Sequence, residues 1–120
     1  MQNNINKVIN ILSKLIVANQ SFKKVLKIKK TKLCLVVLEL LQKQGFIYGY
    51  SNYNNDYYLI FLKYSSNYSL NNALFIKKKI TVTNINTFEK NSLYFIFNKR
   101  GFYINKINNK KINSYTIMRF

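Results

Sequence analysis

The sequence predicts an α+β fold made of two small α/β domains, and three observations lead to that prediction. The first half holds two stretches of helical periodicity separated by strand-like segments. The second half holds short apolar or alternating runs bounded by Asn, Ser and Lys, which is typical of strands and turns. Between them, residues 65–72 are polar and rich in turn formers. We therefore expect an α-β-α-β-β domain over 1–64, a linker over 65–72 and a β-rich domain over 73–120.

The first predicted element is an amphipathic helix over residues 3–18. Its apolar positions recur with the i, i+3, i+4, i+7 spacing of one helix face: Ile5, Val8, Ile9, Leu12, Leu15 and Ile16. We assign that face to the core. A short strand follows over 26–29, where apolar residues alternate with Lys, so one face of that strand should be buried and the other cationic.

A second helix is predicted over residues 32–44. Thr31 offers an N-cap, and Gly45 stands where a glycine commonly ends a helix. The helix is apolar nearly all round, so we expect it to be buried on most sides. Cys34 lies in this helix as a small buried hydrophobe, and a single Cys excludes an internal disulfide.

The remaining elements are predicted to be strands. Residues 46–50 and 57–64 form a hairpin around a turn at 52–56, and the second strand is apolar on both faces, which favours a central strand covered on both sides. Further strands are expected in the second half, where Asn, Asp, Ser and Gly must supply the turns because the chain has no Pro: 73–83, 93–97, 102–104 and 114–120.

The charge of the chain restricts its function more than any motif does. Twenty Lys and Arg stand against three acids, Glu39, Asp56 and Glu89, which gives a formal net charge of +17. A domain with such a charge repels itself and gains most from a polyanion, usually nucleic acid, whose phosphates release counterions on neutralisation. We therefore expect nucleic acid as the partner.

Common catalytic and metal sites are not expected. The chain has no His for a triad or a general base, its acids are far apart in sequence, and its three Gly form no phosphate-binding loop. One Cys without His does not make a zinc site. We expect no catalytic residue, no metal, no cofactor, no small-molecule substrate and no membrane span, the longest apolar run being well short of about 20 residues.

Three stretches occur in an order and spacing that point to a family. The first is Ser13-Lys14 followed by Lys23-Lys24-Val25, and the second is Thr31-Lys32-Leu33 leading into an apolar helix that ends Gln44-Gly45-Phe46-Ile47. The third is the apolar run from Leu93 that ends Asn98-Lys99-Arg100-Gly101 before a closing strand. Together they resemble small-subunit ribosomal protein eight of the bacterial and organellar type.

The resemblance implies two small α/β domains and binding to a helical segment in the central domain of small-subunit ribosomal RNA, mostly through the second domain. It also implies neighbouring small-subunit ribosomal proteins as partners and a role in assembly and translation. This chain departs from the family where Phe97, Asn98 and Lys99 replace a hydroxyl-rich tripeptide before the basic-Gly ending. The usual Arg-Pro-Gly turn and Gly-Gly-Glu loop are also absent.

The candidate RNA-binding residues begin with the loop Asn98, Lys99, Arg100 and Gly101, which combines cations, a small polar group and a glycine. Arg100 can make bidentate contacts that Lys cannot. The other candidates are Lys14, Lys23, Lys24, Lys27, Lys29, Lys30, Lys32, Lys77, Lys78, Lys79, Lys106, Lys110 and Lys111. Four tyrosines have the right chemistry to stack on an unpaired base, although we assign most of them to packing: Tyr48, Tyr50, Tyr53 and Tyr103.

Alternatives stay open at this point. A non-ribosomal basic nucleic-acid-binding protein fits the charge, an accessory protein that contacts mostly other proteins is a further class, and an enzyme is the most distant. Eighteen of the twenty basic residues are Lys, as an AT-rich genome favours, and the N-terminal residues do not read as a presequence. We therefore expect the mitochondrial matrix as the location, with a plastid or the bacterial cytoplasm as alternatives.

Overall fold

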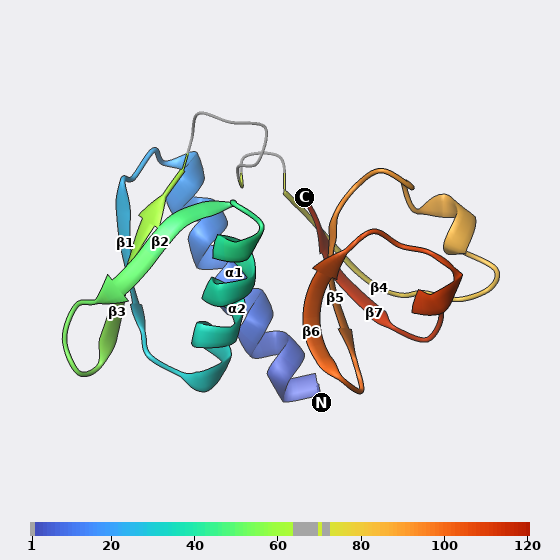
Figure 1. Cartoon of the computed structure of the whole chain (residues 1–120), viewed down its shortest axis with the longest axis horizontal. Helices are drawn as coiled ribbons and strands as arrows, with labels where there is room; N and C mark the ends of the chain where they lie inside the picture. The colour runs from blue at the N-terminus through green and yellow to red at the C-terminus, as the bar shows by residue number, and fades with distance from the viewer. Residues whose placement is uncertain (1, 64–69, 71–72) are drawn as a thin grey trace. The chain divides into compact units, whose positions relative to one another are not determined.

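The computed structural model describes residues 2–63, 70 and 73–120, and the chain divides into two compact units, 1–72 and 73–120 (Figure 1). The described residues form an α+β fold with two antiparallel sheets, which confirms the predicted fold class. Most of the expected linker, 65–69 and 71–72, lies outside the described residues. Leu70, which falls within it, is fully buried.

The first unit has the predicted α-β-α-β-β order. Its elements are α1 (Gln2–Gln20), β1 (Val25–Lys29), α2 (Lys32–Lys43), β2 (Ile47–Asn52) and β3 (Tyr57–Leu62). Thr31 caps α2 by accepting a hydrogen bond at its hydroxyl oxygen from the Cys34 N–H, at 3.0 Å. Gly45 follows α2 with φ +83, the left-handed conformation that a helix-ending glycine adopts.

The three strands of the first unit lie in the order β1-β3-β2, and both helices lie on the same side of the sheet (Figure 1). The core between them includes Leu12, Leu15, Leu38, Leu41 and Ile60, all fully buried. The first helix therefore uses the predicted apolar face, except that Ile9 is only partly buried.

Two burial predictions for this unit are wrong. The strand β3 is central as expected, but it is not covered on both sides, because both helices pack on one face and Phe61 on the other face remains 38% exposed. The helix α2 is buried on one face only, at Cys34, Val37, Leu38 and Leu41, whereas Val36 is 38% exposed. The helix packs against α1 and β2, and these two neighbours leave its outer side open.

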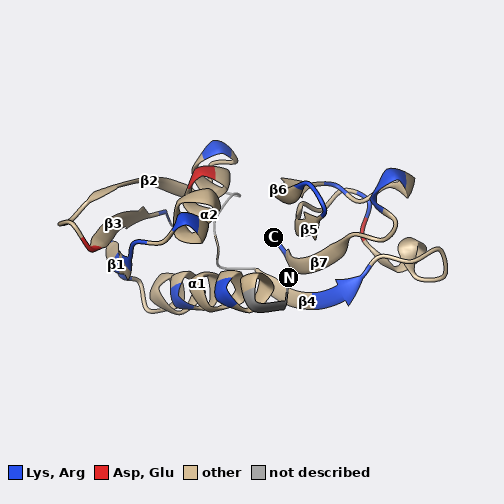
Figure 2. Cartoon of the chain, turned by 90° about the horizontal axis from the view of Figure 1, so that it is seen from below, with Lys and Arg blue, Asp and Glu red and all other residues tan. Residues whose placement is uncertain are grey.

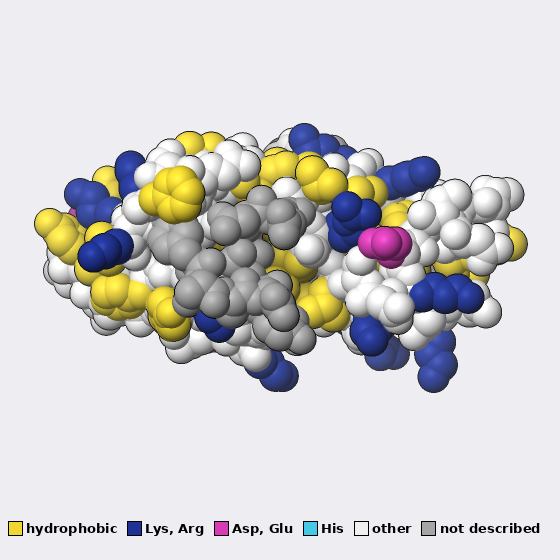
Figure 3. Space-filling model, turned by 90° about the horizontal axis from the view of Figure 1, so that it is seen from above, with side chains coloured by type: hydrophobic (Ala, Val, Ile, Leu, Met, Phe, Trp, Pro, Cys, Tyr) yellow, Lys and Arg dark blue, Asp and Glu magenta, His cyan; other side chains and the backbone are white. Residues whose placement is uncertain are grey.

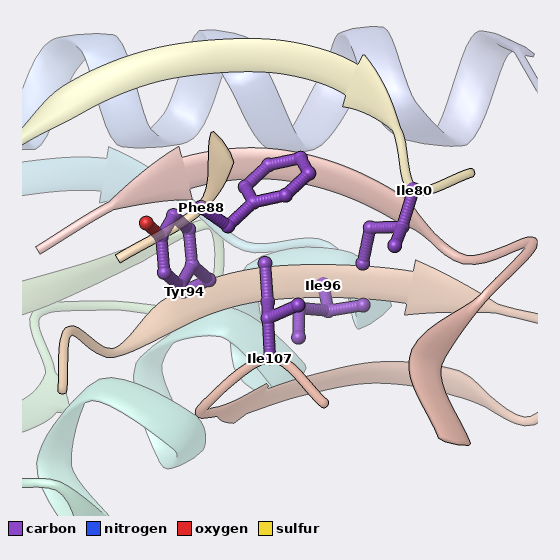
Figure 4. Packing of buried hydrophobic residues seen from close by; sticks show 5 residues of the cluster. All are labelled: Ile80, Phe88, Tyr94, Ile96 and Ile107. Carbon is purple, nitrogen blue, oxygen red and sulfur yellow. The ribbon is translucent and has the colours of Figure 1, made fainter. Parts of the chain in front are cut away.

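The second unit is a four-stranded antiparallel sheet in the order β4-β7-β5-β6. Its elements are β4 (Leu74–Lys79), the 3-10 turn η2 (Ile85–Thr87), β5 (Tyr94–Asn98), β6 (Gly101–Asn105), the 3-10 turn η3 (Asn109–Lys111) and β7 (Tyr115–Arg119). Figure 4 shows part of its core, where five buried side chains from strands and loops pack together: Ile80, Phe88, Tyr94, Ile96 and Ile107.

The predicted strand over 73–83 is too long, because β4 ends at Lys79. Asn84 holds the turn that follows. Its side-chain amide donates to the Lys79 carbonyl at 2.9 Å, and its Oδ1 accepts from the Thr81 N–H at 2.8 Å. Asn commonly bonds nearby backbone in this way, and the bonds replace strand pairing.

Candidate nucleic-acid interface

The turn between β5 and β6 presents the predicted loop. Asn98 pairs with Gly101, so Lys99 and Arg100 form the exposed tip of a hairpin. Gly101 has φ +118, which favours glycine, and a Cβ built at Gly101 would meet nothing within 4 Å. This glycine therefore serves the backbone turn rather than a close approach within the chain.

Asn98 organises that loop through both ends of its side chain. Its Oδ1 accepts from the Arg100 N–H at 2.8 Å, and its Nδ2 donates to the Tyr103 hydroxyl at 2.7 Å. The amide thereby ties the backbone of Arg100 to a side chain two residues into β6. Because the Tyr103 oxygen accepts this bond, its own proton can donate to an incoming phosphate or sugar hydroxyl.

A second turn brings two more cations to the loop. Asn108 Oδ1 accepts from the Lys110 N–H at 2.9 Å, which starts the short turn η3. The Lys111 ammonium lies 4.6 Å from the centre of the Tyr103 ring, a cation–π distance. The β5–β6 loop and η3 are therefore joined through Tyr103.

These two turns enclose a hollow of about 600 Å³ lined by Asn98, Arg100, Tyr103, Lys110 and Lys111. A smaller hollow of about 230 Å³ continues past Lys99, Lys110 and Ser114. Three cations and two neutral hydrogen-bonding side chains thus line the larger hollow, which suits a phosphate–sugar backbone. The sequence separates Lys110 from Arg100 by ten positions, and the fold brings them together.

The strand register places two further lysines at the same end of the sheet. Lys79 pairs with Tyr115, Tyr115 with Phe97, and Phe97 with Phe102, so one row crosses all four strands where β5 ends and β6 begins. We call the cations around this row the basic band: Lys78, Lys79, Lys99, Arg100, Lys110 and Lys111. Three strand spacings make the row about 14 Å wide. Figure 2 shows blue segments at the arrowhead of β4 and in the turn η3.

Lys77 stands beside the band in an unusual conformation. It has φ +53 at a point where the pairing of β4 with β7 shifts register, which marks a β-bulge. Its ammonium lies 5.4 Å from the Phe75 ring. Lys106, by contrast, follows Asn105, which pairs with Tyr94 at the far end of β6, so the fold places Lys106 outside the band.

The candidate lysines of the first unit occupy several surfaces. Lys14 lies on α1 and Lys23 in the turn after it, and both line a largely apolar hollow of about 350 Å³. Lys24 is exposed in the same turn, and Lys32 begins α2. On or next to β1, Lys27 and Lys29 are exposed, and the Lys30 ammonium lies 5.1 Å from the Tyr58 ring.

Few acids offset this charge. Within the described residues, the salt bridge that the structure shows joins Arg119 to Glu89 at 3.5 Å, so one of the two arginines is already paired. The face in Figure 3 carries far more dark-blue than magenta surface. Arg100 is exposed at the hairpin tip, where its fork of donors faces solvent.

Among the described residues, the pKa is shifted for Cys34 and Tyr50, and neither residue belongs to the band. Burial raises the pKa of the Cys34 thiol from 9.0 to about 11, and the nearby Lys14 cation opposes that rise. Burial, followed by the charges of Glu39 and Tyr58, raises the pKa of Tyr50. In the described part of the chain, no group of His, Cys, Asp and Glu side chains is arranged to hold a metal ion, and no helix is long and apolar enough to cross a bilayer.

Comparison with known proteins leaves the family of this chain open. No protein-family model matches the sequence, and no curated protein is significantly similar to it. The residues and their arrangement are therefore the basis on which we infer a function.

Two residues that assemble the interface, Asn108 and Tyr103, have roles that the sequence does not predict. Asn108 positions Lys110, and Tyr103 connects the two turns, whereas the sequence suggested only a stacking or packing role for Tyr103. The run Asn108-Asn-Lys-Lys-Ile-Asn113 indicates a turn at Lys110 and Lys111, since Asn residues commonly form turns.

Proposed function

We propose that the chain is an RNA-binding structural protein of the small ribosomal subunit, similar to ribosomal protein eight. In this proposal the basic band binds a double-helical segment in the central domain of small-subunit ribosomal RNA and thereby supports assembly and translation. The mitochondrial matrix is the proposed location, and neighbouring small-subunit proteins are the proposed protein partners.

The observation that carries the proposal is the convergence of six cations on one end of the second sheet. Side chains do not read the deep, narrow groove of double-stranded RNA, so proteins bind its phosphates and 2′-hydroxyls across the shallow groove. The band offers cations about 14 Å across with a concave centre, and Tyr103 adds a hydroxyl group there. The colinear resemblance supports the ribosomal setting, because the loop from Asn98 to Gly101 stands where that family carries its basic-Gly ending.

Arg100 is the residue that we assign to specific recognition. It lies at the rim of the hollow, its backbone is held by Asn98, and its guanidinium can bind two acceptors at once. The lysines of the band supply phosphate contacts, which depend on charge and not on sequence.

Binding of two RNAs by three variants tests this assignment. We expect Arg100→Ala to weaken binding to a central-domain RNA by about 1 to 3 kcal/mol, by analogy with base readout in DNA, and to weaken binding to an unrelated duplex of equal length much less. Arg100→Lys should lose most of that discrimination while it keeps the salt dependence, because the charge remains but the fork does not. Filter binding at matched salt measures both.

Lys110→Ala is the control for charge alone, because Lys110 lines the same hollow as Arg100 but has no guanidinium fork. It should weaken binding to both RNAs alike. If Arg100→Ala also affects both RNAs equally, the loop is only positive surface and the assigned specificity is wrong. A chain that fails to cosediment with small ribosomal subunits after a high-salt wash would contradict the ribosomal setting and leave a general nucleic-acid-binding protein.

A further inference from the structure

The first unit carries a sheet face that its own helices do not cover. In β1 and β3, Ile28 and Ile60 point into the core, so the alternate residues point to the opposite face. The register pairs Lys27 with Leu59 and Lys29 with Tyr57 across that face. We call it the open sheet face, and its principal side chains are Lys27, Lys29, Tyr53, Tyr57 and Phe61.

Its aromatic side chains are held in place but accessible. Phe61 is 38% exposed in the central strand, and Tyr53 is 56% exposed at the end of the hairpin. The Lys27 ammonium lies 5.0 Å from the centre of the Tyr53 ring and 4.8 Å from that of Tyr57, so one cation positions both rings.

The charge of the open sheet face restricts the kind of partner that can cover it. The described acids of the first unit are Glu39 on α2 and Asp56 in the β2–β3 turn. The strands of the open sheet face therefore present cations, aromatic rings and the aliphatic Val25 and Leu59, but no carboxylate. A complementary partner must therefore offer flat apolar groups and negative charge together. Unpaired nucleotides have both, since every base has a stacking surface and every linkage carries a phosphate.

The spacing also suits a short single strand. Tyr57 and Phe61 are four residues apart on one strand, which is about 14 Å at about 3.4 Å per residue. Sheets that bind single-stranded RNA through aromatic side chains stack two or three bases over such a surface. Lys27 and Lys29 lie on the same face as these rings, within reach of the phosphates.

We infer that the open sheet face is a second nucleic-acid site, which binds a short single-stranded segment. Bases stack on Phe61, Tyr57 and Tyr53, and the lysines contact the phosphates. The inference does not depend on the proposed function, because the basic band is assigned to a double helix and lies on the other unit.

Anisotropy of a labelled single-stranded RNA of about ten nucleotides tests the inference with the full chain. Phe61→Leu keeps an apolar side chain and removes the stacking ring. We expect it to weaken single-strand binding about 5- to 150-fold, the range for the loss of one stacked base. Phe22→Leu is the matched control, because Phe22 is 76% exposed but lies in the turn after α1, and we expect less than a twofold change.

An oligonucleotide of the same length with abasic sites separates stacking from charge. It keeps the phosphates and lacks the bases, so the wild-type chain and Phe61→Leu should bind it equally. Phe61→Leu should also bind duplex RNA normally, which shows that the variant is folded. If Phe61→Leu and Phe22→Leu bind the base-bearing strand alike, the face does not stack bases and the inference is wrong, and a protein partner becomes the better occupant.

Single-strand binding by Arg100→Ala tests the open sheet face independently of the basic band. Arg100→Ala should leave single-strand binding within about twofold, because Arg100 is not on the open sheet face. A loss of single-strand binding in Arg100→Ala as large as in Phe61→Leu would place both activities at the basic band and would overturn the second site.

Discussion

Asn98 shows how one residue type can set the geometry of a binding loop. Its amide bridges the Arg100 backbone and the Tyr103 hydroxyl, and Tyr103 in turn lies under the Lys111 ammonium. The loop is thus arranged before RNA arrives, and a smaller conformational cost on binding favours affinity.

Replacing Asn98 should therefore affect both stability and binding. Asn98→Ala removes two hydrogen bonds, and we expect a loss of about 1 to 2 kcal/mol in the free energy of unfolding, measured by urea denaturation. RNA affinity should fall as well, because Arg100 and Tyr103 lose their common support. Asn105→Ala is the control, since Asn105 lies at the other end of β6 and its Oδ1 accepts from the neighbouring Lys106 N–H. Equal effects of the two variants would contradict the positioning role.

Cys34 provides a second test at the scale of one residue. Its thiol is fully buried, and burial raises its pKa to about 11. A thiol that stays protonated reacts slowly, so we expect little labelling by a thiol reagent at pH 8 until the chain is unfolded. Rapid labelling of the native chain would contradict the packing of α2.

The same pKa shift gives a pH dependence of stability. Below about pH 9 the thiol is protonated in both states and contributes no slope. Between about 9 and 11 the unfolded chain releases the proton and the folded chain keeps it, so stability should fall as pH rises. Cys34→Ala should remove this part of the slope in urea unfolding curves measured at both pH values. An unchanged slope would mean that Cys34 titrates alike in both states.

At the scale of elements, α2 packs one face against α1 and β2 in the first unit. Its buried residues recur at positions 34, 37, 38 and 41, the spacing of one helix face. Leu41 is fully buried, so Leu41→Ala should cost about 2 to 5 kcal/mol in the free energy of unfolding. Val36→Ala on the same helix should cost well under 1 kcal/mol, because Val36 is 38% exposed. Similar losses at both positions would contradict the burial pattern.

Most helices and strands could be predicted from local sequence patterns, but which of their faces are covered in the fold could not. Periodicity located α1, α2 and the strands, and Thr31 and Gly45 marked the ends of α2. Apolar residues on both sides of β3 did not reveal that one side stays open, because the same pattern fits a covered strand or a binding surface. The early end of β4 depends on the side-chain bonds of Asn84, which no periodicity signals.

The residues of the candidate loop could be predicted from the sequence, but the other residues that the fold brings next to the loop could not. The loop from Asn98 to Gly101 stands out in the sequence, since it holds one of two arginines next to one of three glycines. Long-range strand pairing brings this loop close to Lys79 and Lys110. The spacing of residues along the sequence does not reveal the register of that pairing. The same pairing places Lys106 at the other end of β6.

At the scale of the whole molecule, the formal charge of +17 is the dominant property. It exceeds what ion pairs within the described residues offset, and it favours association with a polyanion. The structure shows where two groups of these cations lie. One is the compact basic band on the second unit, and the other is the open sheet face of the first unit, where lysines lie among aromatic rings. The central claim is that the band, and not the total charge, determines duplex RNA binding.

The salt dependence of duplex RNA binding tests this claim most directly, measured for the wild-type chain, Lys110→Ala and Lys106→Ala. Six phosphate contacts predict a slope of about −5 in a log–log plot, which is a loss of about 10³-fold in affinity between about 50 and 200 mM salt. Lys110→Ala should make the slope shallower by about one, whereas Lys106→Ala should leave it unchanged. A flat plot would contradict nucleic-acid binding altogether, and equal slopes for the two variants would show that the band has no special role.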